Sequence, residues 1–300
     1  MRILLTGASG FVGKYVVKKI LNQKHYLLTL SRSPIDIFHP KLEWHKIDLT
    51  DHKKFKDIIS NFAPQVVIHL AWQDIPNYSL SSCLLNLQIS INILHEVVNT
   101  SSCKKILVAG SCWELNKQQG ECFESDFGNP MNHFTWAKNS LRNWLNIETS
   151  KRKIALGWIR IFYVYGPMQR QESLLPTILK ELQDRRVPPI KTPHYANDFI
   201  FVEDVAIGFV RAIEYDFKSE IFHLGSGNST PVWKLCQEAE KLIWGTTVLT
   251  QALLKKHPKP EQLEVDFWAN YDRSHQVLDW TPQTLLETGI QTTWEWTQAA

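Results

Sequence analysis

The sequence lacks any apolar run long enough to cross a membrane. Its longest apolar stretches are of the length of VVIHLAW at 66–72, whereas a membrane-spanning helix needs about 20 apolar residues. The first residues, MRILLTGASG, lead directly into a glycine turn and do not have the pattern of a cleavable signal. We therefore expect a cytoplasmic protein without a membrane partner.

Metal-type cysteine pairs and a strong net charge are also lacking. The five cysteines are an odd number, and no two of them are separated by two residues as in a zinc site. This pattern argues against a disulfide framework and a metal centre, and predicts free thiols. The formal net charge is only +3 and the lysines are scattered, so a basic face for nucleic acid is not expected.

What the sequence does contain is the balance of a globular enzyme. Of its 300 residues, 44% are hydrophobic and 21% are charged, which is enough to bury one large core or two modest ones. Twelve tryptophans are many for this length. Most of them are expected in the core or in a pocket wall, because exposed aromatic surface promotes association.

Strand and helix patterns alternate along the first half of the chain. Short apolar strands are predicted at 2–6, 26–30, 42–47, 65–71, 104–110 and 153–164, and helices at 11–22, 53–62, 84–98 and 133–145. Alternation of this kind predicts an α/β fold of the Rossmann type. In such a fold a doubly wound parallel sheet is covered by helices on both faces, and ligands bind at the carboxyl ends of the strands.

The pattern loosens after YGP at 165–167, where prolines interrupt it. We predict a dinucleotide-binding domain over 1–167, to which 197–225 returns. The segments 168–196 and 226–300 are predicted to form a smaller, mixed C-terminal lobe that binds substrate. The lobe is predicted to hold helices at 173–185 and 231–243. The returning segment 197–225 is predicted to hold a strand followed by a helix within 198–213, and a strand at 221–225.

The glycine turn TGASGFVG at 6–13 places Gly7, Gly10 and Gly13 between the first strand and its helix. Glycine permits a tight turn, a close approach of the backbone to a pyrophosphate, and close packing of helix on strand. The alternative is a structural turn without a ligand. Its place at the first turn of an alternating chain favours dinucleotide binding.

Where the second strand ends, a site for NAD usually offers an acidic residue to the ribose hydroxyls. This chain has Ser31, Arg32 and Ser33 there, and a cation with hydroxyls suits the extra phosphate of NADP. NADP is therefore the expected cofactor, with NAD and a merely solvated Arg32 as the open alternative. Asp48 either accepts a hydrogen bond from the adenine amino group or caps the helix that starts near His52.

Eight motifs follow one another along the chain: TGASGFVG, IDLTD, HLAW, NLQISINIL, RIFYVYGP, DFIFVEDVA, HLGSGNSTPV and VLDWTP. In this order they resemble the extended short-chain dehydrogenase/reductases, the group of NAD(P)-dependent nucleotide-sugar epimerases, dehydratases and reductases. The resemblance covers nearly the whole chain. It implies cofactor contacts at Gly7, Ser9, Gly10, Phe11, Val12, Gly13, Ser31, Arg32, Asp48, Leu49, Leu70, Ala71, Trp72, Asn86 and Lys138.

In this family a serine or threonine, a tyrosine and a lysine act on the substrate. By the resemblance, Ser111 is the serine and Lys138 the lysine, which hydrogen-bonds the nicotinamide ribose. Lys138 falls on the apolar stripe of its helix, where the alternative is a packed stem with an ammonium that reaches water. The tyrosine position is Phe134, which cannot donate or accept a proton.

Several groups offer themselves as substitute proton donors. Tyr163 is the first choice, followed by Tyr78 and Cys112, and for each of them packing or solvation is the alternative. His133 neighbours Phe134, but adjacent helical residues point about 100° apart, so it is not expected to reach the same spot. Trp72, Trp113 and Trp136 are placed by motif beside the cofactor or substrate, with core packing as the alternative.

The substrate diphosphate is often paired with an arginine that begins the family's RDF motif, and here that position is Asn197. Arg160 is either an ion-pair partner or a ligand. Other cations are available to replace the missing arginine: Arg170, Arg185, Arg186 and Lys191.

The sequence thus predicts an NAD(P)-dependent oxidoreductase or epimerase that acts on a nucleotide-activated, keto-deoxy sugar. The alternative is a catalytically impaired dinucleotide-binding or regulatory protein of the same fold. A dehydratase is disfavoured, because those relatives place Asp-Glu after the catalytic threonine and this chain has Cys112 and Trp113. The resemblance also implies a homodimer that packs through the helices near 84–98 and 134–148.

Overall fold

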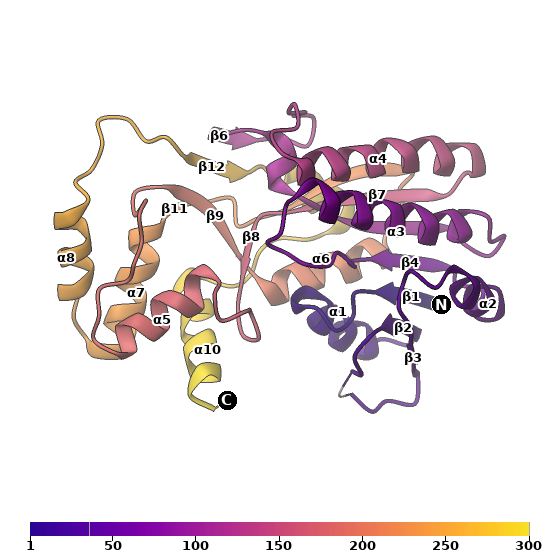
Figure 1. The fold of residues 1–300 in the computed structure, drawn as a ribbon, viewed down its shortest axis with the longest axis horizontal. Coiled ribbons are helices and arrows are strands. Elements are labelled where there is room, and N and C mark those ends of the chain that lie inside the picture. Colours follow the sequence, from indigo (N-terminus) through magenta and orange to yellow (C-terminus); the bar gives the residue numbers. More distant parts are fainter. Residues whose placement is uncertain (36, 300) are drawn as a thin grey trace.

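The computed structural model describes residues 1–35 and 37–299, and is built on a seven-stranded sheet (Figure 1). Every neighbouring pair in this sheet is parallel, as predicted for a Rossmann-type fold. The strands follow one another across the sheet in the order β10 (Ser219–Leu224), β7 (Ala155–Ile161), β5 (Lys105–Ser111), β4 (Val66–His69), β1 (Arg2–Thr6), β2 (Tyr26–Ser31) and β3 (Leu42–Lys46).

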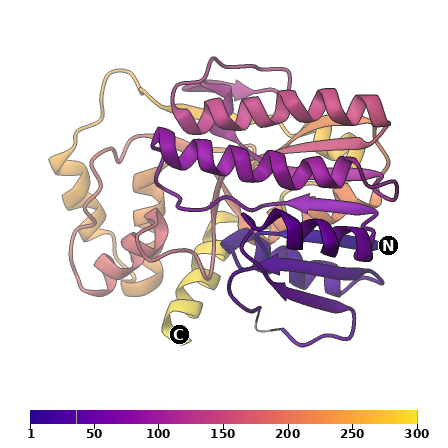
Figure 2. The same cartoon turned by 45° about the vertical axis from the view of Figure 1, so that its right-hand side comes forward.

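Helices cover both faces of this sheet, because successive residues of each strand point to opposite sides and both sides are apolar. Leu4 of β1 packs in one core with Leu94 and Leu141, while Ile3 packs in the other with Val16. Figures 1 and 2 show the two longest helices side by side over one face. The first face carries α2 (His52–Phe62), α3 (Leu80–Val98) and α4 (His133–Arg152), and the second α1 (Phe11–Leu21) and α6 (Val202–Glu214).

A smaller mixed sheet and several helices form the other end of the molecule (Figure 1). The strand β11 runs antiparallel to β9, whereas β12 is parallel to β9 and β6, and β8 pairs with β9 off this path. The strands are β11 (Ser229–Pro231), β9 (Ala196–Phe201), β12 (Asp266–Ala269), β6 (Gln119–Cys122) and β8 (Tyr163–Tyr165). The remaining helices are α5 (Leu174–Gln183), α7 (Val232–Trp244), α8 (Val248–Lys256), α9 (Asp272–Leu278) and α10 (Leu286–Ala299).

The predicted elements are confirmed in kind, with several differences in their boundaries and in the sheet to which they belong. The strand predicted at 153–164 is two strands, because the chain leaves the large sheet at Phe162 and Tyr163 pairs with Phe199 instead. The helix predicted from 84 begins at Leu80, since the Ser79 hydroxyl caps it. The segment 197–201 belongs to the smaller sheet, so the chain returns to the large sheet only with α6. The division into a cofactor domain and a substrate lobe stays a prediction.

No helix of the described residues is both long and apolar enough to span a membrane.

The turn between β1 and α1 has room for glycine only. Gly7 has φ +80°, and a Cβ on it would lie 2.7 Å from the backbone nitrogen of Ala71, at the end of β4. A Cβ on Gly13 would lie 2.0 Å from the carbonyl oxygen of Gly7. The first helix therefore packs directly on the turn, and the turn on the end of a neighbouring strand.

We predict that Gly7→Ala lowers the free energy of unfolding clearly more than Gly120→Ala, as measured by urea denaturation. The two glycines share a left-handed backbone, with φ +80° and +79°, but a Cβ on Gly120 would meet nothing within 4 Å. Both substitutions incur ~1–2 kcal/mol for the backbone conformation, and the overlap at Gly7 adds about 1–3 kcal/mol. Equal losses would contradict the tight packing of this turn.

Candidate active site

The amino-terminal end of α1 offers free backbone amides to an anion. Gly10 is its N-cap residue, no side chain caps the helix, and its first turn holds no acidic residue. The first amides of an α-helix have no acceptor within the helix, and the helix dipole favours negative charge there. The turn, with Ser9, Phe11 and Val12 in it, thus fits the pyrophosphate of a dinucleotide.

At the carboxyl end of β2 the two predicted contacts differ in how free they are. The Ser31 hydroxyl donates to the carbonyl oxygen of Ser33 at 2.6 Å and accepts from the Trp44 indole N–H at 2.8 Å. This leaves Ser31 buried and its hydrogen occupied. Arg32 and Ser33, which follow β2 directly, are both exposed.

Asp48 does not cap α2, so that alternative was wrong. Its carboxylate accepts from the Thr50 amide at 2.9 Å and from the Thr50 hydroxyl at 2.8 Å, and these bonds lower the pKa of Asp48. Asp51 is the cap, accepting from the Lys54 amide at 3.1 Å. Asp48 stays exposed, as a contact to adenine requires, and Leu49 follows it beside the core.

Leu70, Ala71 and Trp72 form the loop at the end of β4, and α3 holds this loop in place. The Asn86 side chain accepts from the Gln73 amide at 2.8 Å and donates to the Gln73 carbonyl oxygen at 3.2 Å. The side-chain amide of Asn86 therefore fixes the loop through two bonds to the Gln73 backbone.

A buried hydrogen-bond chain that the sequence analysis missed lies beneath this loop. The Ser90 hydroxyl donates to the Asn86 carbonyl oxygen at 2.7 Å, so it accepts from His69 Nε2 at 3.0 Å, and His69 Nδ1 accepts from the Thr6 hydroxyl at 2.8 Å. Burial, with a smaller contribution from the charge of Lys138, lowers the pKa of His69 to about 3, which keeps the ring neutral. The signal in the sequence was a histidine inside an otherwise apolar strand.

Ser111 is the last residue of β5, and the Lys138 ammonium contacts the same strand at Ala109. The Lys138 ammonium donates to the Ala109 carbonyl oxygen at 2.9 Å and lies 4.1 Å above the centre of the Trp72 ring. Burial lowers the pKa of Lys138 to about 8, against the opposing effect of the Glu114 carboxylate. The Ser111 hydroxyl accepts from the Trp113 amide at 3.3 Å. Lys138 is buried, so its ammonium does not reach water.

Phe134 is enclosed by three aromatic rings. The ring centres of Tyr78, Trp72 and Trp113 lie 5.1, 5.3 and 6.3 Å from its own. We call these four residues the aromatic cluster. Trp136 is not part of it and remains 39% exposed on α4. The site therefore has a hydrocarbon ring, fully packed, one helical turn before Lys138.

The three proposed donors differ in environment. The Tyr163 phenol accepts from the Trp113 indole N–H at 3.1 Å, and no described residue accepts its own hydrogen. Burial raises the pKa of Tyr163, and also that of Tyr78. Burial likewise raises the pKa of the Cys112 thiol, which is 5% exposed, so the thiolate is disfavoured.

A pocket of about 400 Å³ opens beside Trp113, between the turn that follows β5 and strands of the smaller sheet. Tyr163, Asn197 and Phe267 contribute to its wall. Its one lysine or arginine among the described residues is Lys117, which the sequence analysis missed although it follows the Ser111 segment closely. The Lys117 ammonium donates to the Asp126 carboxylate at 2.9 Å.

Three of the four cations expected to replace the missing arginine are engaged elsewhere. Arg185 stacks on the Trp244 ring at 4.1 Å, and Arg186 pairs with two carboxylates. Arg170 donates to the Ile75 carbonyl oxygen, and Lys191 is exposed. None of these four lines the 400 Å³ pocket. Arg160 is fully buried with its Nε 3.7 Å from Glu114, so the ion-pair alternative is the one the structure supports.

Within residues 1–35 and 37–299, no group of three or more histidine, cysteine or acidic side chains has the arrangement of a metal site.

Comparison with known proteins gives a consistent result. Residues 3–225 match the NAD dependent epimerase/dehydratase family. The chain is 28% identical over 233 residues to a dTDP-6-deoxy-L-talose 4-dehydrogenase (NAD(+)) of Aggregatibacter actinomycetemcomitans, covering 76% of this chain and 85% of that one. It is 25% identical over 309 residues to the dTDP-4-dehydro-6-deoxyglucose reductase of Escherichia coli, covering 96% and 95%.

The fold is shared with solved structures as well. A UDP-glucose 4-epimerase of Thermotoga maritima, solved with UDP-glucose, superposes with a TM-score of 0.84 at 20% identity, covering 100% of this chain and 99% of that one. The predicted resemblance to extended short-chain dehydrogenase/reductases is thereby confirmed. The chain belongs to the NAD-dependent epimerase/dehydratase family, and its relatives are NAD-dependent nucleotide-sugar epimerases and reductases.

Proposed function

We propose that this protein is an NAD(P)-linked oxidoreductase or epimerase for a nucleotide-activated keto-deoxy sugar, in which Phe134 stands at the family's tyrosine position and Tyr163 is the proton donor. The observation that carries this proposal is the Tyr163 phenol in the pocket wall. It is oriented by the Trp113 indole N–H at 3.1 Å, and no described residue accepts its own hydrogen.

Each polar group of the site has a role that its contacts support. The dinucleotide supplies or takes up a hydride when it is bound. The amides of α1 hold its diphosphate, and the Lys138 ammonium, fixed by Ala109, holds the ribose hydroxyls. The Ser111 hydroxyl, oriented by the Trp113 amide, polarises a sugar carbonyl.

The raised pKa of Tyr163 decides how it acts. The phenol stays protonated throughout the physiological pH range, so it is available as a donor. A phenol with a raised pKa is also a weaker acid than a tyrosine whose pKa is tuned toward neutrality. The proposal therefore includes slow proton transfer.

The keto-deoxy sugar is proposed from the relatives. Two of them, at 28% and 25% identity, are named for a dehydrogenase of dTDP-6-deoxy-L-talose and a reductase of dTDP-4-dehydro-6-deoxyglucose. Both names describe oxidation or reduction at a ring carbon of a 6-deoxy sugar carried by a nucleotide. The pocket, with Asn197 and Tyr195 among aromatic rings, offers amide and hydroxyl partners suited to a sugar.

A second candidate function is a protein that binds the dinucleotide without turnover. The observation that favours it is the aromatic cluster, in which Phe134 is packed against three rings and no ionisable group occupies its position. The two candidates differ in what substitution of Phe134 and Tyr163 does to hydride transfer.

We predict that Tyr163→Phe slows hydride transfer by about 100- to 10,000-fold, because a positioned acid is lost, while dinucleotide affinity is unchanged. Stopped-flow loss of NADPH absorbance with a dTDP-4-keto-6-deoxyhexose measures the rate. Tyr215→Phe is the matched control, because Tyr215 bonds to Asp279 outside the pocket.

Phe134→Tyr is expected to lower the rate of hydride transfer by disturbing the aromatic cluster. A large gain from Phe134→Tyr, with no effect of Tyr163→Phe, would instead favour an impaired protein.

We further propose NADP as the preferred dinucleotide, with Arg32 as the residue that selects it. The prediction is that Arg32→Ala weakens NADPH binding by about 10- to 100-fold, the value of one charge-assisted contact, and leaves NADH binding unchanged. Calorimetric titration with each coenzyme measures this. Lys24→Ala, a cation at the opposite end of β2, serves as control. Tighter binding of NADH than NADPH by the unmodified protein would refute the preference.

We also propose a homodimer through α3 and α4. Both helices expose large apolar side chains, including Leu84 at 45%, Leu85 at 44% and Ile147 at 55%. Exposed apolar groups on adjacent helices are typical of a subunit contact. We predict a dimer by size-exclusion chromatography with light scattering, and a monomer for Leu84→Glu combined with Leu85→Glu. Val248→Glu, at an exposed residue of α8, is expected to leave the dimer intact. A monomeric unmodified protein would exclude this assembly.

A further inference from the structure

Glu114 is a buried carboxylate directly behind Ser111. It is 1% exposed and lies in the short 3₁₀ turn Cys112–Leu115. Its Oε1 accepts from the Ser111 backbone amide at 2.8 Å, and its Oε2 accepts from the Trp158 indole N–H at 2.8 Å. Together with the bond from the Trp113 amide to the Ser111 hydroxyl, this forms a reciprocal cap that fixes both the backbone and the side chain of the serine.

Two arginines hold this carboxylate from the other side. Arg142 Nη1 lies 3.8 Å and Arg160 Nε 3.7 Å from Glu114 Oε2, and both side chains are buried. The Phe127 ring covers the two guanidinium groups, with centre distances of 5.0 and 5.6 Å. A buried charge requires partners of this kind, since an unpaired carboxylate in the core is strongly destabilising.

The position of Glu114 depends on a glycine. A Cβ on Gly110 would lie 2.8 Å from Glu114 Oε1 and 2.4 Å from Trp158 Nε1. Any larger residue before Ser111 would therefore displace the carboxylate or the indole. Glycine at position 110 of β5 thus leaves room for the contact between Glu114 and the Trp158 indole.

Glu114 also faces the helix that carries the lysine. Phe134, Lys138 and Arg142 lie one turn apart on α4, and Arg142 is the member of this row that approaches Glu114. The carboxylate raises the pKa of Lys138 and so opposes the effect of burial on that ammonium. One side chain thus acts on both Ser111 and Lys138, on the serine by a hydrogen bond and on the lysine by its charge.

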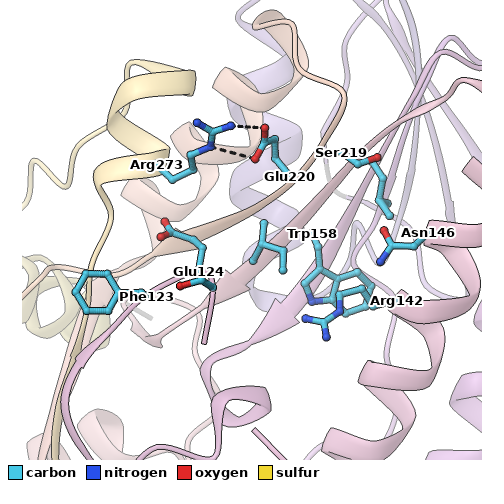
Figure 3. Close-up of a pocket in the computed structure, with 11 residues that line it drawn as sticks. Phe123, Glu124, Arg142, Asn146, Trp158, Ser219, Glu220 and Arg273 are labelled. Carbon is cyan, nitrogen blue, oxygen red and sulfur yellow. Dashed lines mark hydrogen bonds and ion pairs between the residues drawn. The ribbon is translucent and has the colours of Figure 1, made fainter. Parts of the chain in front are cut away.

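The outer side of this arrangement borders a cavity of about 510 Å³ (Figure 3). Arg142 and Trp158 line the cavity, and the Arg273–Glu220 ion pair lies across from them. Glu114 does not line it. The arginine and the indole therefore separate the carboxylate from open solvent, which preserves the strength of its contacts.

We propose that Glu114 is a positioning residue: its carboxylate orients Ser111 through the serine's backbone amide and, through Arg142, faces the helix that carries Lys138. The proposal rests on the function proposed above for Ser111 and Lys138. Glu114 touches neither substrate nor cofactor in this assignment. It acts through the two groups that do.

The test is Glu114→Gln in the full-length protein, a change that keeps the shape and removes the charge. Two readouts need no substrate: the titration of Lys138 followed by NMR of ε-¹³C-labelled lysine, and the hydrogen exchange of the Ser111 amide. We expect the Lys138 midpoint to fall by about one pH unit and the amide to exchange faster. With a dTDP-4-keto-6-deoxyhexose and NADPH, we expect kcat to fall about 10- to 100-fold with little change in KM.

Two further variants make the outcome decisive. Glu124→Gln removes a different half-buried carboxylate near Arg160, one without a bond to Ser111, and is expected to leave the Lys138 midpoint and kcat unchanged. Trp158→Phe keeps the charge of Glu114 but removes its indole partner, so kcat is expected to fall about tenfold with an unchanged Lys138 midpoint. If Glu114→Gln does not fold, this variant carries the test.

The proposal is overturned if folded Glu114→Gln has an unchanged Lys138 midpoint and an unchanged Ser111 exchange rate, or if Trp158→Phe changes neither kcat nor that exchange rate. If the unmodified protein turns over no sugar nucleotide, the proposed function fails. The Lys138 titration and Ser111 exchange then still decide whether Glu114 positions these groups.

Discussion

The site depends on keeping the charge of Lys138 inside the core. Burial alone disfavours an ammonium, and it lowers the pKa of Lys138 to about 8. Three neighbours offset this effect: the Ala109 carbonyl oxygen at 2.9 Å, the face of Trp72 at 4.1 Å, and the charge of Glu114. These neighbours come from β5, the loop after β4 and the turn after Ser111. A single buried charge therefore brings three separate segments together near Ser111, the last residue of β5.

One helical turn before Lys138, the Phe134 side chain is held by apolar packing and not by polar partners. A phenol there would need a hydrogen-bond partner or an open site, whereas a phenylalanine ring needs only neighbours to pack against. Trp72, Tyr78 and Trp113 supply that packing, and Trp113 also donates its indole N–H to Tyr163. The same tryptophan thus closes the cluster and orients the phenol in the pocket. In the proposed function, proton donation moves from the helix to β8, at the expense of acid strength.

The features predictable from the sequence are those set by local rules. The glycine turn was predictable because only glycine avoids the overlap of Gly7 with Ala71 and of Gly13 with Gly7. The large sheet was predictable because short apolar runs of strand length alternate with amphipathic helical patterns along the chain. The strands β6 and β12 were not found, since each has four residues and its partner lies more than a hundred positions away, as in the pairing of Gln119 with Asp266.

The sequence indicated which polar side chains lie near the ends of strands and helices, but it did not indicate their hydrogen-bond partners. Asp48 was assigned a possible cap because it lies three residues before Asp51, yet a cap is decided by the first helical residue, and boundaries are uncertain by a few residues. Ser31 has the right residue type and position, but the Ser33 carbonyl and the Trp44 indole occupy its hydroxyl. Hydrogen-bond partners of this kind are set by the tertiary structure, and the spacing of residues in the sequence does not reveal them.

The smaller sheet completes the pocket through one more buried carboxylate. Asp198 is fully buried within β9, next to Asn197, and it accepts from the backbone amides of Ser226, Gly227 and Ala269. These three bonds join β9 to the loop after β10 and to β12, which carries Phe267 of the pocket wall. Burial raises the pKa of Asp198, while the three amides favour its charged form. Because an amide or apolar side chain could not accept all three bonds, the wall around Asn197 and Phe267 keeps its shape only with a carboxylate at this position.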